Sequence, residues 1–324
     1  MRTGYKIGGY LAGLAAVFTA ALGVGQVAGG PAAPSTSTEQ PGHGHGTPDS
    51  GHTSDSATAQ PGKNSTGTGN PARGGGATRT PGGLAVAQDG YRLVPLTTTL
   101  ATGPANPFSF RVLGPDGSPV TAYTPTHDKN LHLIVVRRDL SGFQHVHPQM
   151  AVDGTWSVPL TIASAGPMRL IADFQPAARS DNVTLGVDIP APGDYRPVPL
   201  PATGRSASAG DGYTVTLDGD LEPGTSSTLT LTVSRYGTPV TDLEPYLAAY
   251  GHLVALRDGD LAYLHVHPDG GPGDGRTPSG PAVTFQVEVP SAGAYRLYLD
   301  FQHLGAVRTA EFTVLAGVHG DSHG

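Results

Sequence analysis

The sequence contains no cysteine, and its 324 residues include only three methionines and one tryptophan. The absence of cysteine excludes disulfides, lipid attachment through a cysteine, and metal sites built from thiolates. Charged residues make up only 14% of the chain, the formal net charge is -7, and no basic patch alternates with aromatic residues. A phosphate backbone would therefore find little to bind, and we expect no nucleic-acid partner.

Long amphipathic helical patterns are also missing, whereas glycine and proline are abundant at 47 and 30 residues. The apolar stretches are short, rich in Val, Thr and Leu, and bounded by turn residues, as in FSFRVL, LHLIVV and TLTLTVS. This pattern is typical of short strands joined by turns. We predict an all-β fold: two tandem Ig-like antiparallel β-sandwich domains of about seven strands each, after an N-terminal apolar helix and a disordered linker.

The first 29 residues resemble a targeting segment. Arg2 and Lys6 precede an apolar run over residues 7–29 that contains no acidic residue. Positive charge before an apolar run of about 20 residues is typical of a signal peptide or a membrane anchor whose N-terminus stays inside. No clean Ala-x-Ala cleavage site follows, so both alternatives stay open. We expect the rest of the chain to lie on the extracellular face of the membrane, anchored through this transmembrane helix, or to be secreted.

Residues 30–87 are rich in Pro, Gly, Ser and Thr and poor in apolar side chains. Such a segment cannot bury enough apolar area to offset the entropy lost on ordering, so we predict a disordered tether. His43, His45 and His52 lie within it. They either collect metal loosely or are ordinary linker residues, because His-rich tracts bind metal only in some proteins.

After the tether the chain repeats itself. SAGPMRLIADFQ at residues 164–175 matches SAGAYRLYLDFQ at 291–302, and GSPVT at 117–121 matches GTPVT at 237–241. A repeated sequence of this length indicates a tandem duplication. The Pro, Gly and Ser residues between the copies mark the boundary. We predict a first domain over residues 88–199, a linker over 200–210, a second domain over 211–316, and a flexible tail over 317–324.

Each copy contains the sequence His-Val-His-Pro. Residues i and i+2 of a strand point to the same face, so His145 and His147 are expected to share a face. The strand LHLIVV and the turn RRDLSG precede them and predict a hairpin that returns His132 to a position opposite this pair. All three imidazoles then share one face, unless the register slips by one residue. His252 occupies the equivalent position in the second copy, before His265 and His267.

The second copy adds His303, directly after a predicted strand. If that strand end folds over the hairpin, His303 is a fourth ligand. Asp173 and Asp300 are weaker candidates, and we expect them to pair with nearby arginines or to cap backbone N–H groups. The predicted metal ligands are therefore His132, His145, His147, His252, His265, His267 and His303.

Histidines in a core can also be hydrogen-bonded residues without any ligand, and this alternative stays open. Several imidazoles buried together would each need a separate partner, which favours a shared ion. Imidazole ligands suit Cu(II) and Zn(II), whereas Cu(I) prefers thiolate or thioether, so we expect a copper or zinc ion as the cofactor. The proline after each pair predicts a site at the rim of the sandwich, open to solvent.

The segments DGYRL, GSPVT, NLHLIVVRRDLSGFQHVHP and AGPMRLIADFQP together resemble exported actinobacterial proteins described as heavy-metal-binding or YtkA-like. The resemblance covers both copies, from residue 88 to about 315. It implies a cell-surface role in handling metal, copper above all, with other surface metal-handling proteins as partners.

From these features we predict an extracytoplasmic protein that sequesters or hands on Cu(II) or Zn(II) through His clusters on β-hairpins, without enzymatic activity. One alternative is a metal-dependent enzyme of the superoxide dismutase or cupin type. Cupins place a glutamate a few residues after their H-x-H motif, and none follows here. The further zinc ligands of a superoxide dismutase are not recognisable. Another alternative is a structural cell-surface β-sandwich interaction module without metal.

Overall fold

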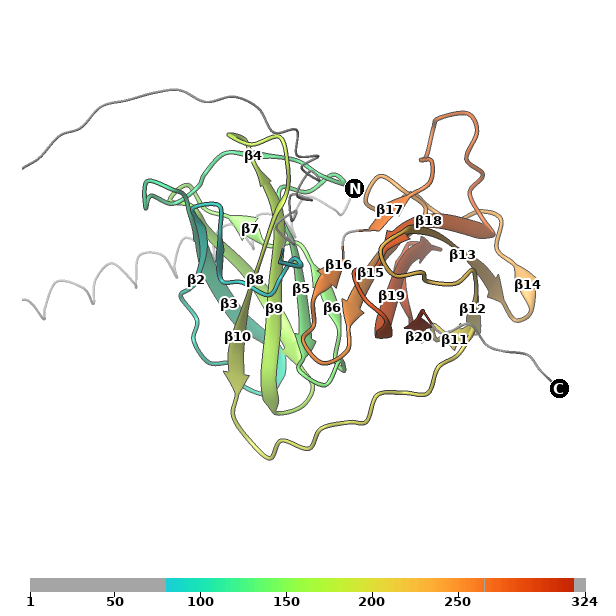
Figure 1. The fold of residues 1–324 in the computed structure, drawn as a ribbon, viewed down its shortest axis with the longest axis horizontal. Coiled ribbons are helices and arrows are strands. Elements are labelled where there is room, and N and C mark those ends of the chain that lie inside the picture. The colour runs from blue at the N-terminus through green and yellow to red at the C-terminus, as the bar shows by residue number, and fades with distance from the viewer. Residues whose placement is uncertain (1–79, 265, 318–324) are drawn as a thin grey trace, which may run out of the picture. The chain divides into compact units, whose positions relative to one another are not determined.

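The structure is a computed structural model that describes residues 80–264 and 266–317. These residues belong to one compact unit. They form strands β1 to β20, and the described part of the chain contains no helix. Every pairing between named strands is antiparallel. The predicted all-β class with two tandem sandwich domains is confirmed (Figure 1).

The first repeat contains two sheets. One sheet has the order β1 (Ala87–Gln88), β2 (Tyr91–Pro95), β3 (Gly103–Leu113), β8 (Thr155–Ile162) and β7 (Gln149–Met150). The other has the order β10 (Val183–Ala191), β9 (Gly166–Pro176), β5 (His132–Arg137) and β6 (Gln144–Val146), and β4 (Tyr123–Thr124) pairs with β9.

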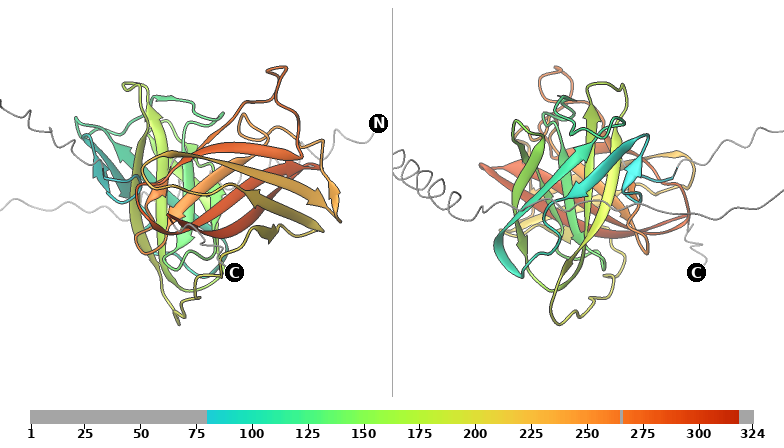
Figure 2. Two further views of the ribbon diagram at one scale, coloured as in Figure 1. Left: turned by 45° about the vertical axis from the view of Figure 1, so that its right-hand side comes forward. Right: turned by 90° about the vertical axis from the view of Figure 1, so that its left-hand side faces the viewer.

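The second repeat has the same arrangement, seen from two further directions in Figure 2. One sheet has the order β11 (Ser206–Ser208), β12 (Tyr213–Asp218), β13 (Ser226–Arg235), β18 (Ala282–Glu288) and β17 (Val266–Pro268), and β14 (Thr238–Pro239) pairs with β13. The other has the order β16 (Tyr263–Leu264), β15 (His252–Arg257), β19 (Gly293–His303) and β20 (Ala306–Ala316).

Register as well as strand order is shared by the two repeats. His132 pairs with Asp173 across β5 and β9, and His252 pairs with Asp300 across β15 and β19. Each sandwich closes over its own apolar core, because strands such as β12 alternate buried and exposed residues in the period of two that a half-buried strand requires.

The central strands β5 and β15 depart from this alternation, because nearly all of their residues are buried. One face of each strand, including Leu133 and Leu253, belongs to the core of its own sandwich. The other face belongs to a third apolar cluster in which the two repeats meet. Its buried members are Ile134, Val136, Leu140, Ile171, Val254, Leu256, Leu261, Tyr263 and Tyr298. The two sandwiches therefore pack together through the outer faces of their inner sheets.

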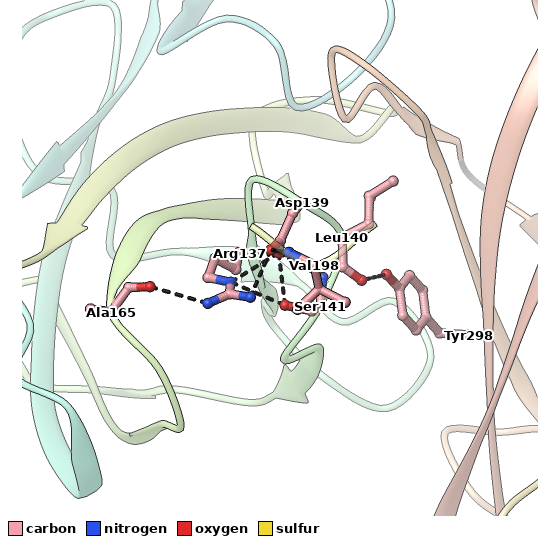
Figure 3. Close-up of polar contacts among 7 residues, drawn as sticks. All are labelled: Arg137, Asp139, Leu140, Ser141, Ala165, Val198 and Tyr298. Carbon is pink, nitrogen blue, oxygen red and sulfur yellow. Dashed lines mark hydrogen bonds and ion pairs between the residues drawn. The ribbon is translucent and has the colours of Figure 1, made fainter. Parts of the chain in front are cut away.

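The turn after β5 anchors this packing (Figure 3). Leu140 has a φ of 63°, and its carbonyl oxygen accepts a hydrogen bond of 2.6 Å from the hydroxyl of Tyr298 in the other repeat. Phe143 stacks on the Tyr298 ring at 3.9 Å between centroids. Arg137 forms a buried ion pair with Asp139 and donates to the carbonyl of Ala165, which holds the turn in place.

The segment upstream of β1 contacts both repeats. Gly83 N–H donates to the Thr184 carbonyl of the first repeat at 3.0 Å, and the Gly83 carbonyl accepts from Arg169. Tyr263 N–H of the second repeat donates to the Gly82 carbonyl at 2.9 Å. A side chain at Gly186 would overlap the Gly83 carbonyl, so this close approach requires glycine there.

Replacing Tyr298 should weaken the packing of the two repeats. We expect Tyr298→Ala to lower the free energy of unfolding by about 3–5 kcal/mol, as for other buried aromatic residues. Tyr298→Phe, which removes the hydroxyl that donates to the Leu140 carbonyl, should lower it by about 0.5–1.5 kcal/mol. Urea unfolding followed by tryptophan fluorescence measures both. Tyr236→Ala is the matched control, because Tyr236 is 77% exposed. Equal losses for Tyr298→Ala and Tyr236→Ala would contradict the buried role of Tyr298.

Candidate metal centre

The three histidines of the first repeat lie on the hairpin of β5 and β6. Ile134 pairs directly with His145. Because alternate residues of a strand share a face, His132 lies on the same face as Ile134, and His147 on the same face as His145. The register is therefore the one that places all three imidazoles on one face.

The ring nitrogens of this triad, His132, His145 and His147, come close together. His132 Nδ1 lies 3.0 Å from His145 Nε2 and 3.2 Å from His147 Nε2. Within residues 80–264 and 266–317, these three side chains are the group close enough to hold one ion, with ligand atoms all within 4.8 Å of one another.

In His132 and His145, the nitrogen that faces away from the triad determines which nitrogen carries the lone pair. His132 Nε2 lies 2.9 Å from the Thr126 carbonyl, which can only accept, so this nitrogen donates its N–H and Nδ1 carries a lone pair in the neutral ring. His145 Nδ1 lies 3.0 Å from Asp300 Oδ2, so it donates to the carboxylate, and in the neutral ring Nε2 carries a lone pair. When both rings are neutral, two lone pairs face each other at 3.0 Å. A proton or a metal cation between them removes their repulsion.

Burial keeps two rings of the triad neutral. Desolvation, and then the charge of His145, lower the pKa of His132 from 6.5 to about 4. Desolvation, followed by the charges of His145 and His132, lowers the pKa of His147 to about 3. At pH 7 both imidazoles are unprotonated and can donate a lone pair, which is the state a metal ligand requires.

The site is more enclosed than the sequence predicts. β6 ends at Val146, so Pro148 lies just after a strand end as expected, but His132 is only 2% exposed. The reason is the second repeat, whose His252 lies against the triad. The His252 ring is 5.5 Å from the His132 ring and nearly parallel to it at 6°, and it is 4.7 Å from the His145 ring. The predicted opening to solvent is therefore wrong for His132, whereas His147 borders a surface hollow beside Gln149 and Ser109.

His303 does not join the other histidines. It lies three residues after Asp300 on β19, and therefore on the opposite face of the strand from Asp300 and its neighbour His252. Both of its ring nitrogens have partners on that side: Nδ1 lies 2.7 Å from the Tyr213 hydroxyl and Nε2 lies 3.1 Å from Asp242 Oδ1. The prediction of His303 as a fourth ligand is wrong because it ignored the period of two along the strand.

The second predicted cluster is not assembled as the first one is. β16 ends at Leu264, and Val266–Pro268 then pairs with β18 in the other sheet, where His267 lies opposite Gln286 with an exposed side chain. His252 packs on the first repeat's triad instead. His265 lies outside the described residues, as do His43, His45 and His52 of the predicted tether and the apolar run at residues 7–29. No helix in the described part of the chain is long and apolar enough to cross a membrane.

Two further residues, Asp300 and His127, also belong to this site. Asp300 contacts His145 and accepts a 2.6 Å hydrogen bond from the Thr309 hydroxyl. The expected pairing of Asp300 with a nearby arginine is wrong, because Arg296 pairs with Glu311. The recurrence of Asp-Phe-Gln in both copies was the available signal. His127 lies 5.3 Å from the His252 ring, and it has no histidine counterpart in the second repeat that could have drawn attention to it.

The chain belongs to the family described as Domain of unknown function (DUF8832), which matches residues 85–196 and 207–317 and therefore occurs in two tandem copies. No curated protein matches the chain. The heavy-metal-binding and YtkA-like resemblance is not part of what this family match shows, and it stays a prediction.

Several solved structures are similar to this chain. They include the Escherichia coli adhesin FdeC (16% identity, 72% of this chain and 66% of that chain, TM-score 0.22) and the Yersinia pseudotuberculosis adhesin InvE (11%, 71% and 60%, TM-score 0.21). Invasin, a bacterial integrin-binding protein, is another (15%, 72% and 41%, TM-score 0.19). The chain spans less than two thirds of each of these structures. At such TM-scores the likeness carries no information about function.

Acid should destabilise the metal-free protein in a defined pH range. The folded-state pKa values of His132 and His147 lie below the ordinary 6.5, so only the unfolded chain takes up protons as the pH falls below 6.5. The free energy of unfolding should be constant above about pH 6.5 and should decrease towards pH 4. His132 should account for a decrease on the order of 3 kcal/mol.

Urea unfolding in a metal chelator, measured at half-unit steps between pH 7.5 and 4.5, tests this expectation. His147→Gln should flatten the slope, because glutamine does not titrate. An unfolding free energy that is independent of pH across this range would show that the rings are not held neutral.

Proposed function

We propose that this chain is an extracytoplasmic metal-binding protein that holds one Cu(II) or Zn(II) ion through the imidazoles of His132, His145 and His147. It sequesters the ion or passes it on and has no catalytic role. The observation that carries the proposal is the approach of three ring nitrogens from one hairpin.

The spacing of the nitrogens is compatible with a metal ion. In a tetrahedral site with Zn–N bonds of about 2.0 to 2.1 Å, two ligand nitrogens lie about 3.3 Å apart. The nitrogen separations of 3.0 and 3.2 Å in the triad are close to this value. Three protein ligands leave a fourth position for water or for a ligand from a receiving protein. His147, which borders the surface hollow, marks the side from which such a ligand can approach.

The ligand type limits the choice of metal. Neutral imidazoles suit Cu(II) and Zn(II), and at equal availability affinity is higher for Cu(II). Cu(I) prefers sulfur ligands, but the chain has no cysteine, and Met168 is buried in the core of the first sandwich. We therefore expect an oxidised copper or a zinc ion. Other surface metal-handling proteins are the expected partners.

A second candidate is a cell-surface β-sandwich module that binds a protein partner and no metal. In this case a proton lies between His132 and His145, and the pair with Asp300 is an ion pair within a structural core. Both ring nitrogens of His132 and of His145 already have polar partners within the protein, which favours this candidate.

Metal stoichiometry separates the two candidates. We expect the full chain, purified without an affinity His tag and measured by inductively coupled plasma mass spectrometry, to lose one equivalent of Zn(II) or Cu(II) on His147→Ala. His267→Ala is the matched control and should lose none, because His267 is exposed on the other sheet. Both variants should be made in a background with alanine at His43, His45 and His52, so that the predicted tether adds no ions. Equal metal content in the two variants would reject the triad as a metal site.

The location of the protein is a separate prediction. Because Arg2 and Lys6 precede an apolar run without acidic residues, we expect export with the N-terminus inside. Protease added to intact cells should digest the part of the chain after residue 30, while a cytoplasmic marker stays intact. Recovery of the full-length chain in the soluble cytoplasmic fraction would contradict this. The mass of the mature N-terminus distinguishes an anchor from a cleaved signal.

A further inference from the structure

We infer that the second repeat completes the metal site of the first, with Asp300 as a positioning residue for His145, so that ion binding and the docking of the two repeats favour each other. This inference rests on the proposed function. It starts from one contact between repeats: His145 Nδ1 lies 3.0 Å from Asp300 Oδ2, with the two side chains only 1% and 4% exposed.

The carboxylate determines which nitrogen of His145 is available. Asp300 Oδ1 accepts from the Thr309 hydroxyl at 2.6 Å, which fixes the orientation of the carboxylate. The other oxygen then accepts the Nδ1–H of His145 and leaves the Nε2 lone pair directed at His132 and His147. Metal-bound histidines commonly donate their second N–H to a carboxylate in this way, which fixes the tautomer and raises the basicity of the ligand nitrogen. The first repeat alone does not supply this carboxylate.

The second repeat also supplies a wall of the site. His252 stacks on His132 at 5.5 Å, and its ring lies 4.7 Å from that of His145. His252 and Asp300 are neighbours across β15 and β19, so the two residues approach the triad from the same face of one sheet. The apolar cluster of Ile134, Val136, Val254 and Leu256 continues along this face and holds it against β5.

Thermodynamic linkage then couples the two events. If docking of the second repeat raises the affinity of the triad for the ion, the ion must favour the docked state by the same factor. The metal ion would therefore stabilise the docking of the two copies of the domain. One ion per chain would be bound with contributions from both copies. The equivalent carboxylate of the first repeat, Asp173, has the same threonine contact, from the Thr184 hydroxyl at 2.8 Å, but its other contacts are to Asn182 and Tyr263 instead of a triad histidine.

Zn(II) affinity of the full chain, measured by competition with a chromogenic chelator, tests the positioning role. We expect Asp300→Ala to weaken binding by about 10- to 100-fold, the usual cost of losing a carboxylate behind a metal-bound histidine. Asp300→Asn keeps an oxygen acceptor and should restore part of the loss. Asp218→Ala is the control, because it removes an exposed carboxylate of the second repeat, on β12 in the other sheet, and should change affinity less than threefold. Equal losses for Asp300→Ala and Asp218→Ala would overturn the positioning role.

Amide hydrogen exchange of the parent chain, with and without Zn(II), tests the coupling. We expect Zn(II) to slow exchange in β5 and β6 of the first repeat and also in β15 and β19 of the second. In Asp300→Ala at saturating Zn(II), the slowing should be confined to the first repeat. If Zn(II) binds the parent and slows exchange in β5 and β6 alone, the coupling is wrong and the triad stands as a site of one repeat. If Zn(II) slows neither repeat and His147→Ala retains its metal, the proposed function and this inference both fail.

Discussion

The structure depends on the burial of the second face of two sheets. In most sandwiches the outer face of each sheet meets water, but here the outer faces of β5 and β15 cover one another through the third apolar cluster. Burying an aliphatic or aromatic side chain contributes about 1.5–3 kcal/mol, so this cluster is a substantial part of the stability of the pair. One face of β5 carries His132, Ile134 and Val136, which lie at every second position of the strand. The packing that buries the two apolar side chains also buries the imidazole. The low pKa of His132 is a consequence of this packing.

Local regularities of the chain were sufficient to predict the fold and one half of the site. Short alternating segments and the tandem repeat indicated two sandwiches, because both signals can be read from the sequence without knowing which segments are in contact. The grouping of His132 with His145 and His147 followed from strand periodicity and a hairpin of ordinary length. The same periodicity, counted from Asp300, places His303 on the opposite face. That error came from treating the end of a strand as free to fold over.

The rest of the site could not be read from local pattern, because it arises from contacts between segments far apart in the chain. Asp300 lies 155 residues from His145, and nothing near either residue indicates their contact. A weaker signal existed in LHLIVV and GHLVAL, whose apolar residues are continuous rather than alternating, as expected for strands covered on both faces. The chain also changes sheet between β16 and β17, which places His267 opposite Gln286 and in a different sheet from His252.

The segment at Gly82 and Gly83 has a mechanical consequence. Its backbone is bonded to Thr184 of one repeat and to Tyr263 of the other, immediately beside the cluster that joins them. A pulling force applied to the chain from its N-terminal side is therefore shared between both sandwiches at their junction, before it reaches β1. The force would first break the two backbone hydrogen bonds of Gly82 and Gly83. The long pairings of β3 with β8 and of β9 with β10 would not bear the force at that stage.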